Sequence, residues 1–263
     1  MKRFAVIGDP IAQSLSPFLH QEVYHQLGLD ASFEKIHVKT NELHTFMNSN
    51  ELDGFNVTIP HKQLVIPLLD ELNESAKIIG AVNCVKNGKG FNTDWIGFLK
   101  ALEINGLDLK GKDCVILGAG GAARAIAFGL IQAHVNSISI NNRTQNTAKQ
   151  LLDWIHSFFP NNDPSEIPDV IINCTPLGMW PETESTPMTL NEIKPNLILV
   201  DTIYNPIETQ WLKLGKEKGA KTIGGLDMFI AQGLASAEIW FSGNITDKVD
   251  ISALRAVLKQ KLI

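Results

Sequence analysis

The stretch Cys114-Val-Ile-Leu-Gly118-Ala119-Gly120-Gly121-Ala122-Ala123 decides how the second half of this 263-residue chain folds. Its apolar start predicts a buried strand, and residues 122–131 have the composition of a following helix. The residues between them fit the G-x-G-x-x-[GA] pattern. The first glycine permits a tight turn, the second lets the backbone approach a pyrophosphate, and the helix N-terminus attracts its charge. We therefore predict a dinucleotide-binding strand–helix unit here.

The end of the next predicted strand, residues 137–141, indicates which nucleotide binds. An NAD site usually carries Asp or Glu at this point, where the carboxylate accepts hydrogen bonds from the ribose hydroxyls. Here the strand is followed by Asn142, Arg143 and Thr144, without a carboxylate. A lone arginine is most often a solvated surface residue, but at this position its guanidinium can pair with a 2′-phosphate. The pattern favours NADP over NAD.

Short β-type runs alternate with helical patterns along the whole chain, which is typical of an α/β protein with mostly parallel sheets. In the first part we expect strands at 4–8, 32–38, 54–59, 81–85 and 90–92, and helices at 17–27, 42–50, 61–69, 74–79 and 95–104. After a polar segment, 106–113, we expect strands at 114–117, 137–141, 170–173, 197–201 and 222–223. Helices at 227–241 and 251–262 end the chain. Two α/β domains are expected, and periodicity does not assign the last two helices to either.

Polar residues gather near the ends of the strands in the first half. They are Ser14 and Ser16, Asn56, Thr58 and Lys62, Asn83, and Asn92 to Asp94. Each has an ordinary structural explanation when taken alone; Ser16, for example, is positioned to cap a helix that begins at Pro17. Because open α/β sheets bind ligands at the carboxyl ends of their strands, we predict a pocket for a small polyhydroxylated molecule.

The composition excludes several classes of protein. A hydrophobic fraction of 44% excludes disorder, and a formal net charge of −5 provides no basic surface for nucleic acid. The longest apolar runs fall short of the roughly 20 residues that span a bilayer. Cys84, Cys114 and Cys174 form neither a metal-ligand spacing nor a disulfide framework. We expect a cytoplasmic protein with no metal and with no nucleic-acid or membrane partner.

Together these segments resemble the shikimate dehydrogenase family. The matching blocks run in family order at 8–20, 55–62, 80–83, 92–94, 118–123, 142–144, 173–179, 201–206 and 224–228, followed by Gln232 and Trp240. The resemblance implies a substrate domain of residues 1–103, completed by the C-terminal helices 227–263. It places a Rossmann-type, doubly wound NADP domain at 104–226. It also implies reversible reduction of 3-dehydroshikimate to shikimate with NADP(H), by a monomer or a homodimer.

The resemblance further implies roles for individual residues. Lys62 and Asp94 match the catalytic pair of the family. The substrate-binding positions correspond to Ser14, Ser16, Thr58, Lys62, Asn83, Asp94, Tyr204 and Gln232, with the serines on the substrate carboxylate. The cofactor-binding positions correspond to Gly118, Ala119, Gly120, Gly121, Ala122, Asn142, Arg143, Thr144, Thr175, Met179, Gly225 and Met228.

Three residues depart from the family pattern: Gln21, Trp95 beside Asp94, and Thr147, where many members carry a second basic residue. Thr147 weakens the expected hold on a 2′-phosphate, and Lys149 is the nearest substitute. Two alternatives stay open: a relative that accepts quinate or NAD, and a non-catalytic NADP-binding sensor. A methylenetetrahydrofolate dehydrogenase shares the two-domain plan, but the Ser-Leu-Ser-Pro and Asn-Thr-Asp segments disfavour it.

Overall fold

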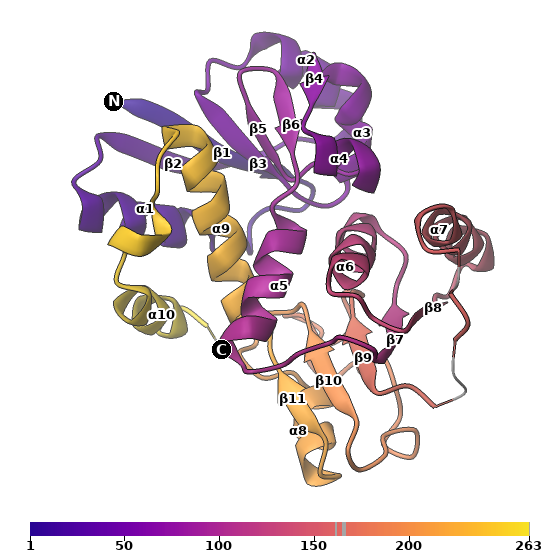
Figure 1. Cartoon of the computed structure of the whole chain (residues 1–263). Helices are drawn as coiled ribbons and strands as arrows, with labels where there is room; N and C mark the ends of the chain where they lie inside the picture. The colour runs from indigo at the N-terminus through magenta and orange to yellow at the C-terminus, as the bar shows by residue number, and fades with distance from the viewer. Residues whose placement is uncertain (161, 165–166, 263) are drawn as a thin grey trace. The chain divides into compact units, whose positions relative to one another are not determined.

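The computed structural model describes residues 1–160, 162–164 and 167–262 (Figure 1). The chain forms two compact units: the first comprises residues 1–97 and 230–261, and the second comprises 98–229 with Leu262. The chain passes between them inside two helices, α5 (Asp94–Ile104) and α9 (Leu226–Phe241). The domain boundaries expected from the family resemblance, after 103 and before 227, lie in the same two helices and stay a prediction.

The first unit is built on a six-stranded sheet with the order β2-β1-β3-β5-β6-β4. Its strands are β1 (Lys2–Gly8), β2 (Ala31–His37), β3 (Gly54–Val57), β4 (Glu71–Leu72), β5 (Cys84–Lys86) and β6 (Lys89–Phe91). Strand β1 is parallel to β2 and β3, whereas β5 is antiparallel to both of its neighbours. Its remaining helices are α1 (Ser16–Leu27), α2 (Leu43–Ser49), α3 (His61–Leu64), α4 (Glu74–Ile79) and α10 (Ile251–Lys259).

Aromatic packing joins α9 to the sheet of the first unit. The Trp240 ring stacks on Phe4 of β1 with 4.7 Å between centroids, and its indole Nε1 donates to the Val85 carbonyl at 3.0 Å. His20 of α1 stacks on Phe33 of β2 with 4.3 Å between centroids. All of these aromatic side chains are buried. Because burial of large rings contributes several kcal/mol, the C-terminal half of α9 is held in this unit.

The second unit has a fully parallel five-stranded sheet with the order β11-β10-β9-β7-β8. The strands are β7 (Asp113–Leu117), β8 (Ser137–Asn141), β9 (Val170–Asn173), β10 (Ile198–Asp201) and β11 (Lys221–Ile223), and the helices are α6 (Gly121–Gln132), α7 (Gln145–Phe158) and α8 (Gln210–Glu217) (Figure 1). Counted from β7, this is the doubly wound order 2-1-3-4-5. The order reverses between β7 and β9, which is where such sheets bind ligands.

The start of α1 differs from the prediction. Ser16 is the first helical residue and Leu15 the N-cap, and no side chain caps the helix. The Ser16 N–H instead donates to the Ser14 hydroxyl at 3.3 Å. The prediction that Ser16 caps this helix is therefore wrong, because the helix begins one residue earlier than Pro17 suggests.

Several predicted elements of the first unit are shorter than expected. Strand β3 ends at Val57, and Ile59 is 62% exposed, because the chain turns and the His61 N–H bonds to the Thr58 carbonyl. The helix predicted over 61–69 ends at Leu64 and gives way to a 3-10 turn that contains Pro67, which has no N–H to continue an α-helix. The predicted elements did not include β4, α7 or α8.

Crossing a bilayer requires a long, apolar helix, and none is found among the described residues.

His20 gives the first unit a testable acid sensitivity. Burial lowers the pKa of His20 from 6.5 to about 3. The unfolded chain therefore binds a proton in this range that the folded chain does not, so His20 stabilises the fold above pH 6.5 and loses that contribution as the pH falls. The free energy of unfolding should decrease by roughly 1.4 kcal/mol per pH unit from this residue alone.

We expect His20→Phe to flatten this dependence between about pH 6.5 and pH 4 in urea unfolding. His25→Phe is the matched control, because His25 lies on the same helix but is exposed. Equal pH slopes in the wild type and in His20→Phe would contradict the prediction.

Candidate active site

Lys62 and Asp94 form an ion pair in the first unit. Lys62 Nζ lies 2.6 Å from Asp94 Oδ2, and the two side chains are 15% and 7% exposed. Asp94 opens α5, where the positive end of the helix dipole favours a carboxylate. Because the pair is shielded from water, its attraction is screened less than that of a surface pair. An ammonium group held in this way can donate a proton to an oxygen that gains negative charge.

Two amide side chains orient Asp94. Its Oδ1 accepts a hydrogen bond from Asn83 Nδ2 at 2.9 Å, and its backbone N–H donates to Asn92 Oδ1 at 3.0 Å. Asn83 Nδ2 also lies 3.3 Å from Gln232 Oε1 on α9. Four residues that the sequence assigned to the substrate site, from four separate segments, thus form one connected group: Lys62, Asn83, Asp94 and Gln232.

A second polar layer adjoins this group: Asn56 and Thr93 belong to the predicted strand-end cluster but were given no individual role, and Ser236 was not predicted. Asn56 Nδ2 donates to Ser236 Oγ at 2.9 Å, and Ser236 Oγ lies 3.2 Å from Thr93 Oγ1. The Thr93 N–H donates to Asn83 Oδ1 at 2.6 Å. All of these residues are buried. Asn56 and Thr93 stand out in the sequence as polar residues at strand ends, but Ser236 lies in an apolar helical run without any such signal.

The serines and Thr58 lie at the carboxyl ends of two paired strands. Ser14 and Ser16 follow β1, and their hydroxyl oxygens are 3.2 Å apart. Thr58 follows β3, which is parallel to β1, and its N–H donates to the Ile7 carbonyl at 2.9 Å. Both loops therefore leave the same edge of the sheet. Among the described residues, no hydrogen bond joins these three side chains to Lys62 or Asp94.

The glycine-rich turn of the second unit fits a bound pyrophosphate. Gly118 has a φ of +107°, and a Cβ there would lie 3.1 Å from the Cys174 carbonyl oxygen, so the turn requires glycine. Gly120 is the N-cap of the twelve-residue helix α6 and brings no side-chain acceptor. The first N–H groups of α6, from Gly121 and Ala122, are therefore suited to an anion. Ala119 completes the turn.

The strand register brings the other predicted cofactor segments, and Tyr204, which was predicted to bind the substrate, to the same edge of the sheet. Leu117 pairs with Asn141 and with Asn173, and Asn173 pairs with Asp201. The segments that follow these strand ends carry the glycine turn, Asn142 to Thr144, Thr175 with Met179, and Tyr204. Parallel strands place all of these segments at their carboxyl ends, where doubly wound sheets bind nucleotides.

The Arg143 segment is held in a turn that leaves this residue exposed. Asn142 Nδ2 donates to the Thr144 carbonyl at 2.9 Å and to Thr147 Oγ1 at 2.7 Å. The Thr147 hydroxyl donates to the Thr144 carbonyl at 2.8 Å, so this departure from the family pattern braces the turn. Within the described residues Arg143 has no ion pair, whereas Lys149 pairs with a carboxylate one helical turn further on.

The remaining predicted cofactor residues, and the predicted substrate residue Tyr204, differ in their surroundings. Met179 is 43% exposed, but Met228 is only 9% exposed and packs in the core of the second unit. Tyr204 stacks on Phe229 with 4.1 Å between ring centroids. A Cβ on Gly225 would lie 2.4 Å from a backbone carbonyl oxygen, so only glycine fits there.

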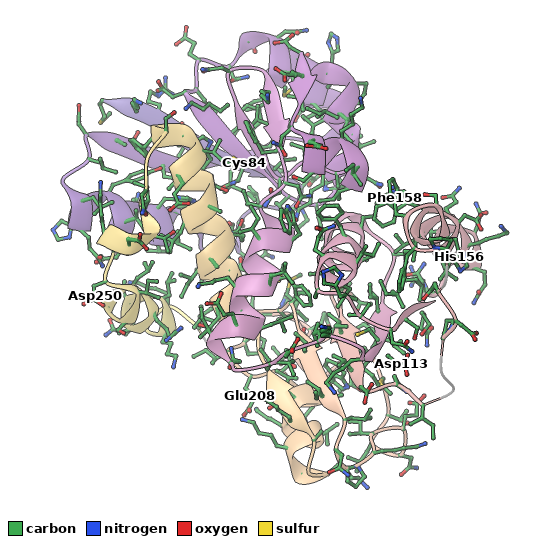
Figure 2. All side chains as sticks on the ribbon, viewed as in Figure 1. Cys84, Asp113, His156, Phe158, Glu208 and Asp250 are labelled. Atoms are coloured by element: carbon green, nitrogen blue, oxygen red, sulfur yellow. The ribbon has the colours of Figure 1, made fainter. Side chains whose placement is uncertain are left out.

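Cys84 and Cys114 offer no nucleophile. Cys84, labelled in Figure 2, and Cys114 are buried, and burial raises the pKa of each thiol to about 12. Thiols in this state are unreactive at neutral pH. The described residues also contain no group of three His, Cys, Asp or Glu side chains placed to hold a metal ion.

A shielded lysine–aspartate pair in one α/β unit and a glycine-rich turn in a doubly wound unit define the class of two-domain dehydrogenases that use a dinucleotide. The family model for the shikimate dehydrogenase substrate binding domain matches residues 6–85, and that for shikimate / quinate 5-dehydrogenase matches 100–175. The shikimate dehydrogenase (NADP(+)) of Bacillus cereus (strain AH187) is 42% identical over 253 residues, covering 90% of this chain and 91% of that relative. The chain belongs to the shikimate dehydrogenase family.

Solved structures agree with this assignment over the full length. A crystal structure of a shikimate dehydrogenase in complex with NADP+ has a TM-score of 0.91 and 35% identity, covering 100% of this chain and 96% of that chain. The enzyme from Thermus thermophilus, in complex with NADP(H) and shikimate, has a TM-score of 0.86 and 32% identity, and each chain is covered to 100%.

The buried layer behind the ion pair can be tested through Ser236. Ser236→Ala removes the hydroxyl that accepts from Asn56 and contacts Thr93. One buried N–H of Asn56 then loses its acceptor, while Asn56 Nδ2 keeps its bond to the Asn83 carbonyl. We expect the free energy of unfolding to fall by about 1–3 kcal/mol. Ser242→Ala is the control, because it removes an exposed hydroxyl just beyond the same helix that accepts from Lys86. Equal effects of the two substitutions in urea unfolding would contradict the prediction.

Proposed function

We propose that this chain catalyses the reversible, NADP-dependent reduction of 3-dehydroshikimate to shikimate in aromatic amino-acid biosynthesis. The observation that carries the proposal is the Lys62–Asp94 pair, 2.6 Å apart and held by Asn83, in a member of the shikimate dehydrogenase family. The glycine turn at Gly118 supports the proposal that a dinucleotide binds, and Arg143, just after β8, supports the choice of NADP.

The bound nicotinamide supplies the hydride, so the chain has to orient two rings and move one proton. As the substrate carbonyl is reduced, negative charge develops on its oxygen. The Lys62 ammonium stabilises this charge and donates the proton, and in the reverse direction Lys62 takes the proton from the hydroxyl. Asp94 holds Lys62 Nζ in place through one carboxylate oxygen.

We assign the rest of the substrate site by the same reasoning. Ser14 and Ser16 bind the substrate carboxylate, and the residues on the ring hydroxyls and carbonyl are Thr58, Asn83, Asp94 and Gln232, with Tyr204 nearby. The hydroxyl pair of the serines and the amides around Asp94 provide donors and acceptors of the right kind. A polyhydroxylated ring is recognised by several such groups.

The cofactor assignments follow the carboxyl edge of the second sheet. Gly118, Ala119, Gly120, Gly121 and Ala122 hold the pyrophosphate, and Asn142, Arg143 and Thr144 hold the 2′-phosphate and adenosine. Thr175, Met179, Gly225 and Met228 surround the nicotinamide half. The core position of Met228 leaves it a supporting role beneath that site rather than an exposed contact.

An absorbance assay at the nicotinamide wavelength tests the proposal and its rivals together. Shikimate-dependent reduction of NADP, with slower use of NAD and of quinate, is the expected result. Equal use of NAD or quinate would instead favour a dehydrogenase of broader specificity. Binding of both ligands without turnover would favour a sensor.

We also propose that the partners are these small molecules alone, that the chain works in the cytoplasm without nucleic acid or membrane, and that it is a monomer or a homodimer. The net charge of −5 and the buried, unpaired thiols of Cys84 and Cys114 support this.

The role of Lys62 can be separated from substrate binding. Lys62→Ala should reduce turnover by roughly 10²- to 10⁴-fold, the usual contribution of a positioned acid–base group. Shikimate binding, measured by calorimetry, should change far less, because the other substrate contacts remain. Lys89→Ala is the control, since Lys89 pairs with Glu71 on the surface. Turnover near the wild-type rate in a folded Lys62→Ala protein would disprove the proton-transfer role.

Arg143 is tested through cofactor preference. Arg143→Ala should weaken NADP use by roughly 1.5–3 kcal/mol, the contribution of a hydrogen bond to a charged group, and should leave NAD use nearly unchanged. Lys149→Ala, which removes an exposed charge already paired on α7, should alter neither. The steady-state kcat/KM for each cofactor is the measurement. An equal loss for both cofactors would show that Arg143 does not contact the 2′-phosphate.

A further inference from the structure

One buried carboxylate lies at the junction of two loops of the second unit. Asn173 is the last residue of β9 and Asp201 the last residue of β10, and the two are direct partners in the parallel register. The loop after Asn173 carries Thr175 and Met179, and the loop after Asp201 carries Tyr204. Asp201 is 1% exposed and Asn173 is 0% exposed.

Asp201 accepts hydrogen bonds from three directions. Its Oδ1 accepts from Asn173 Nδ2 at 3.1 Å and from the Ile203 N–H at 3.0 Å, and its Oδ2 accepts from Thr209 Oγ1 at 2.8 Å. Thr209 is in turn the N-cap of α8 and accepts from the Leu212 N–H. The carboxylate therefore fixes both ends of its own loop, 202–209, and one residue of the neighbouring strand.

Asn173 passes this constraint on to the other loop. Its Oδ1 accepts from both the N–H and the hydroxyl of Thr175, at 3.0 and 2.6 Å. Its Nδ2 donates to the Leu177 carbonyl at 3.2 Å as well as to Asp201. The amide orientation of Asn173, and with it the position of the Thr175 turn, thus depends on an acceptor at Asp201.

The chemistry of this junction requires an acceptor-only group. Two of the partners of Asp201, an amide NH₂ and a backbone N–H, can only donate, and an ionised carboxylate satisfies both together with the Thr209 hydroxyl. Among the described residues no Lys, Arg or His pairs with Asp201, and the nearby Glu208, labelled in Figure 2, pairs with Lys216. Burial raises the pKa of Asp201 to about 6. A buried carboxylate without a counter-ion destabilises the fold, and a neutral side chain of similar size could fill the same space. The presence of Asp201 therefore points to a role other than stability.

We propose that Asp201 is a positioning residue for the cofactor: its carboxylate sets the two loops that carry Thr175, Met179 and Tyr204. This inference rests on the proposed NADP site. Protonated Asp201 has one fewer acceptor position and one O–H to place, and only the Thr209 hydroxyl can turn to accept it. The loops are therefore set best above about pH 6 and lose their constraint as the pH falls through that value.

Calorimetric NADP binding to wild type and Asp201→Asn between about pH 8 and pH 5 tests the inference. The 2′-phosphate titrates near pH 6 as well, so the ratio of the two Kd values is compared at each pH. We expect Asp201→Asn to bind NADP about ten-fold more weakly at pH 8, the loss of one hydrogen bond to a charged group. The ratio should approach one near pH 5, because protonated Asp201 is as neutral as asparagine.

Two controls separate positioning from general stability. Asp113→Asn alters a carboxylate at the start of β7, labelled in Figure 2, that accepts from Asn136 and Ser137 in the same unit. It should leave NADP binding unchanged. If Asp201→Asn does not fold, Thr209→Val should weaken NADP binding and Thr209→Ser, which keeps the hydroxyl, should restore it.

The inference is overturned if folded Asp201→Asn binds NADP within two-fold of wild type, or if the Kd ratio is constant with pH. If Asp201→Asn does not fold, the inference is overturned when Thr209→Val and Thr209→Ser bind NADP with the same Kd. A wild type that binds NADP but does not oxidise shikimate removes the proposed reaction and leaves the inference supported by the same Kd ratios. A wild type that binds no NADP overturns both.

Discussion

The ion pair between Lys62 and Asp94 is the interaction on which the first unit's site depends. An ammonium group shielded from water has to be paired, and a shielded carboxylate has to be satisfied at both oxygens. Asn83 meets the second requirement; Thr93 holds Asn83 in turn, and Ser236 contacts Thr93. The result is a charge that is fixed in place before any substrate arrives, which is the condition under which electrostatic stabilisation contributes most.

The second unit solves a similar problem with a different arrangement. The parallel strands β7, β8, β9 and β10 have their carboxyl ends at one edge of the sheet. The loops that follow these strands therefore begin close together. Glycine allows the first loop to approach a ligand closely. The loops after β9 and β10 are instead joined to each other through Asn173 and Asp201. Backbone geometry creates the binding edge, and buried polar contacts fix its details.

Each unit therefore combines an apolar scaffold with a small number of buried polar residues. In the first unit, Phe4 and Trp240 hold α9 against the sheet, which places Gln232 and Ser236 next to residues distant in sequence. In the second, core residues of α6 and the strands hold the glycine turn at its strand end. Packing determines where the elements lie, and the polar groups, which are costly to bury without partners, determine which side chains meet.

The sequence by itself determined the α/β class, the glycine turn at Gly118 and the polar residues at strand ends, because these follow from local pattern and backbone freedom. It did not determine that Ser16 begins a helix rather than capping it, or that β3 ends at Val57, because turn contacts decide such boundaries. Nor did it indicate that Ser236 contacts Asn56 and Thr93, or that Asp201 joins two loops through Asn173 and Thr209. Those depend on contacts between segments far apart in the chain, and only the tertiary structure brings such segments within hydrogen-bond distance.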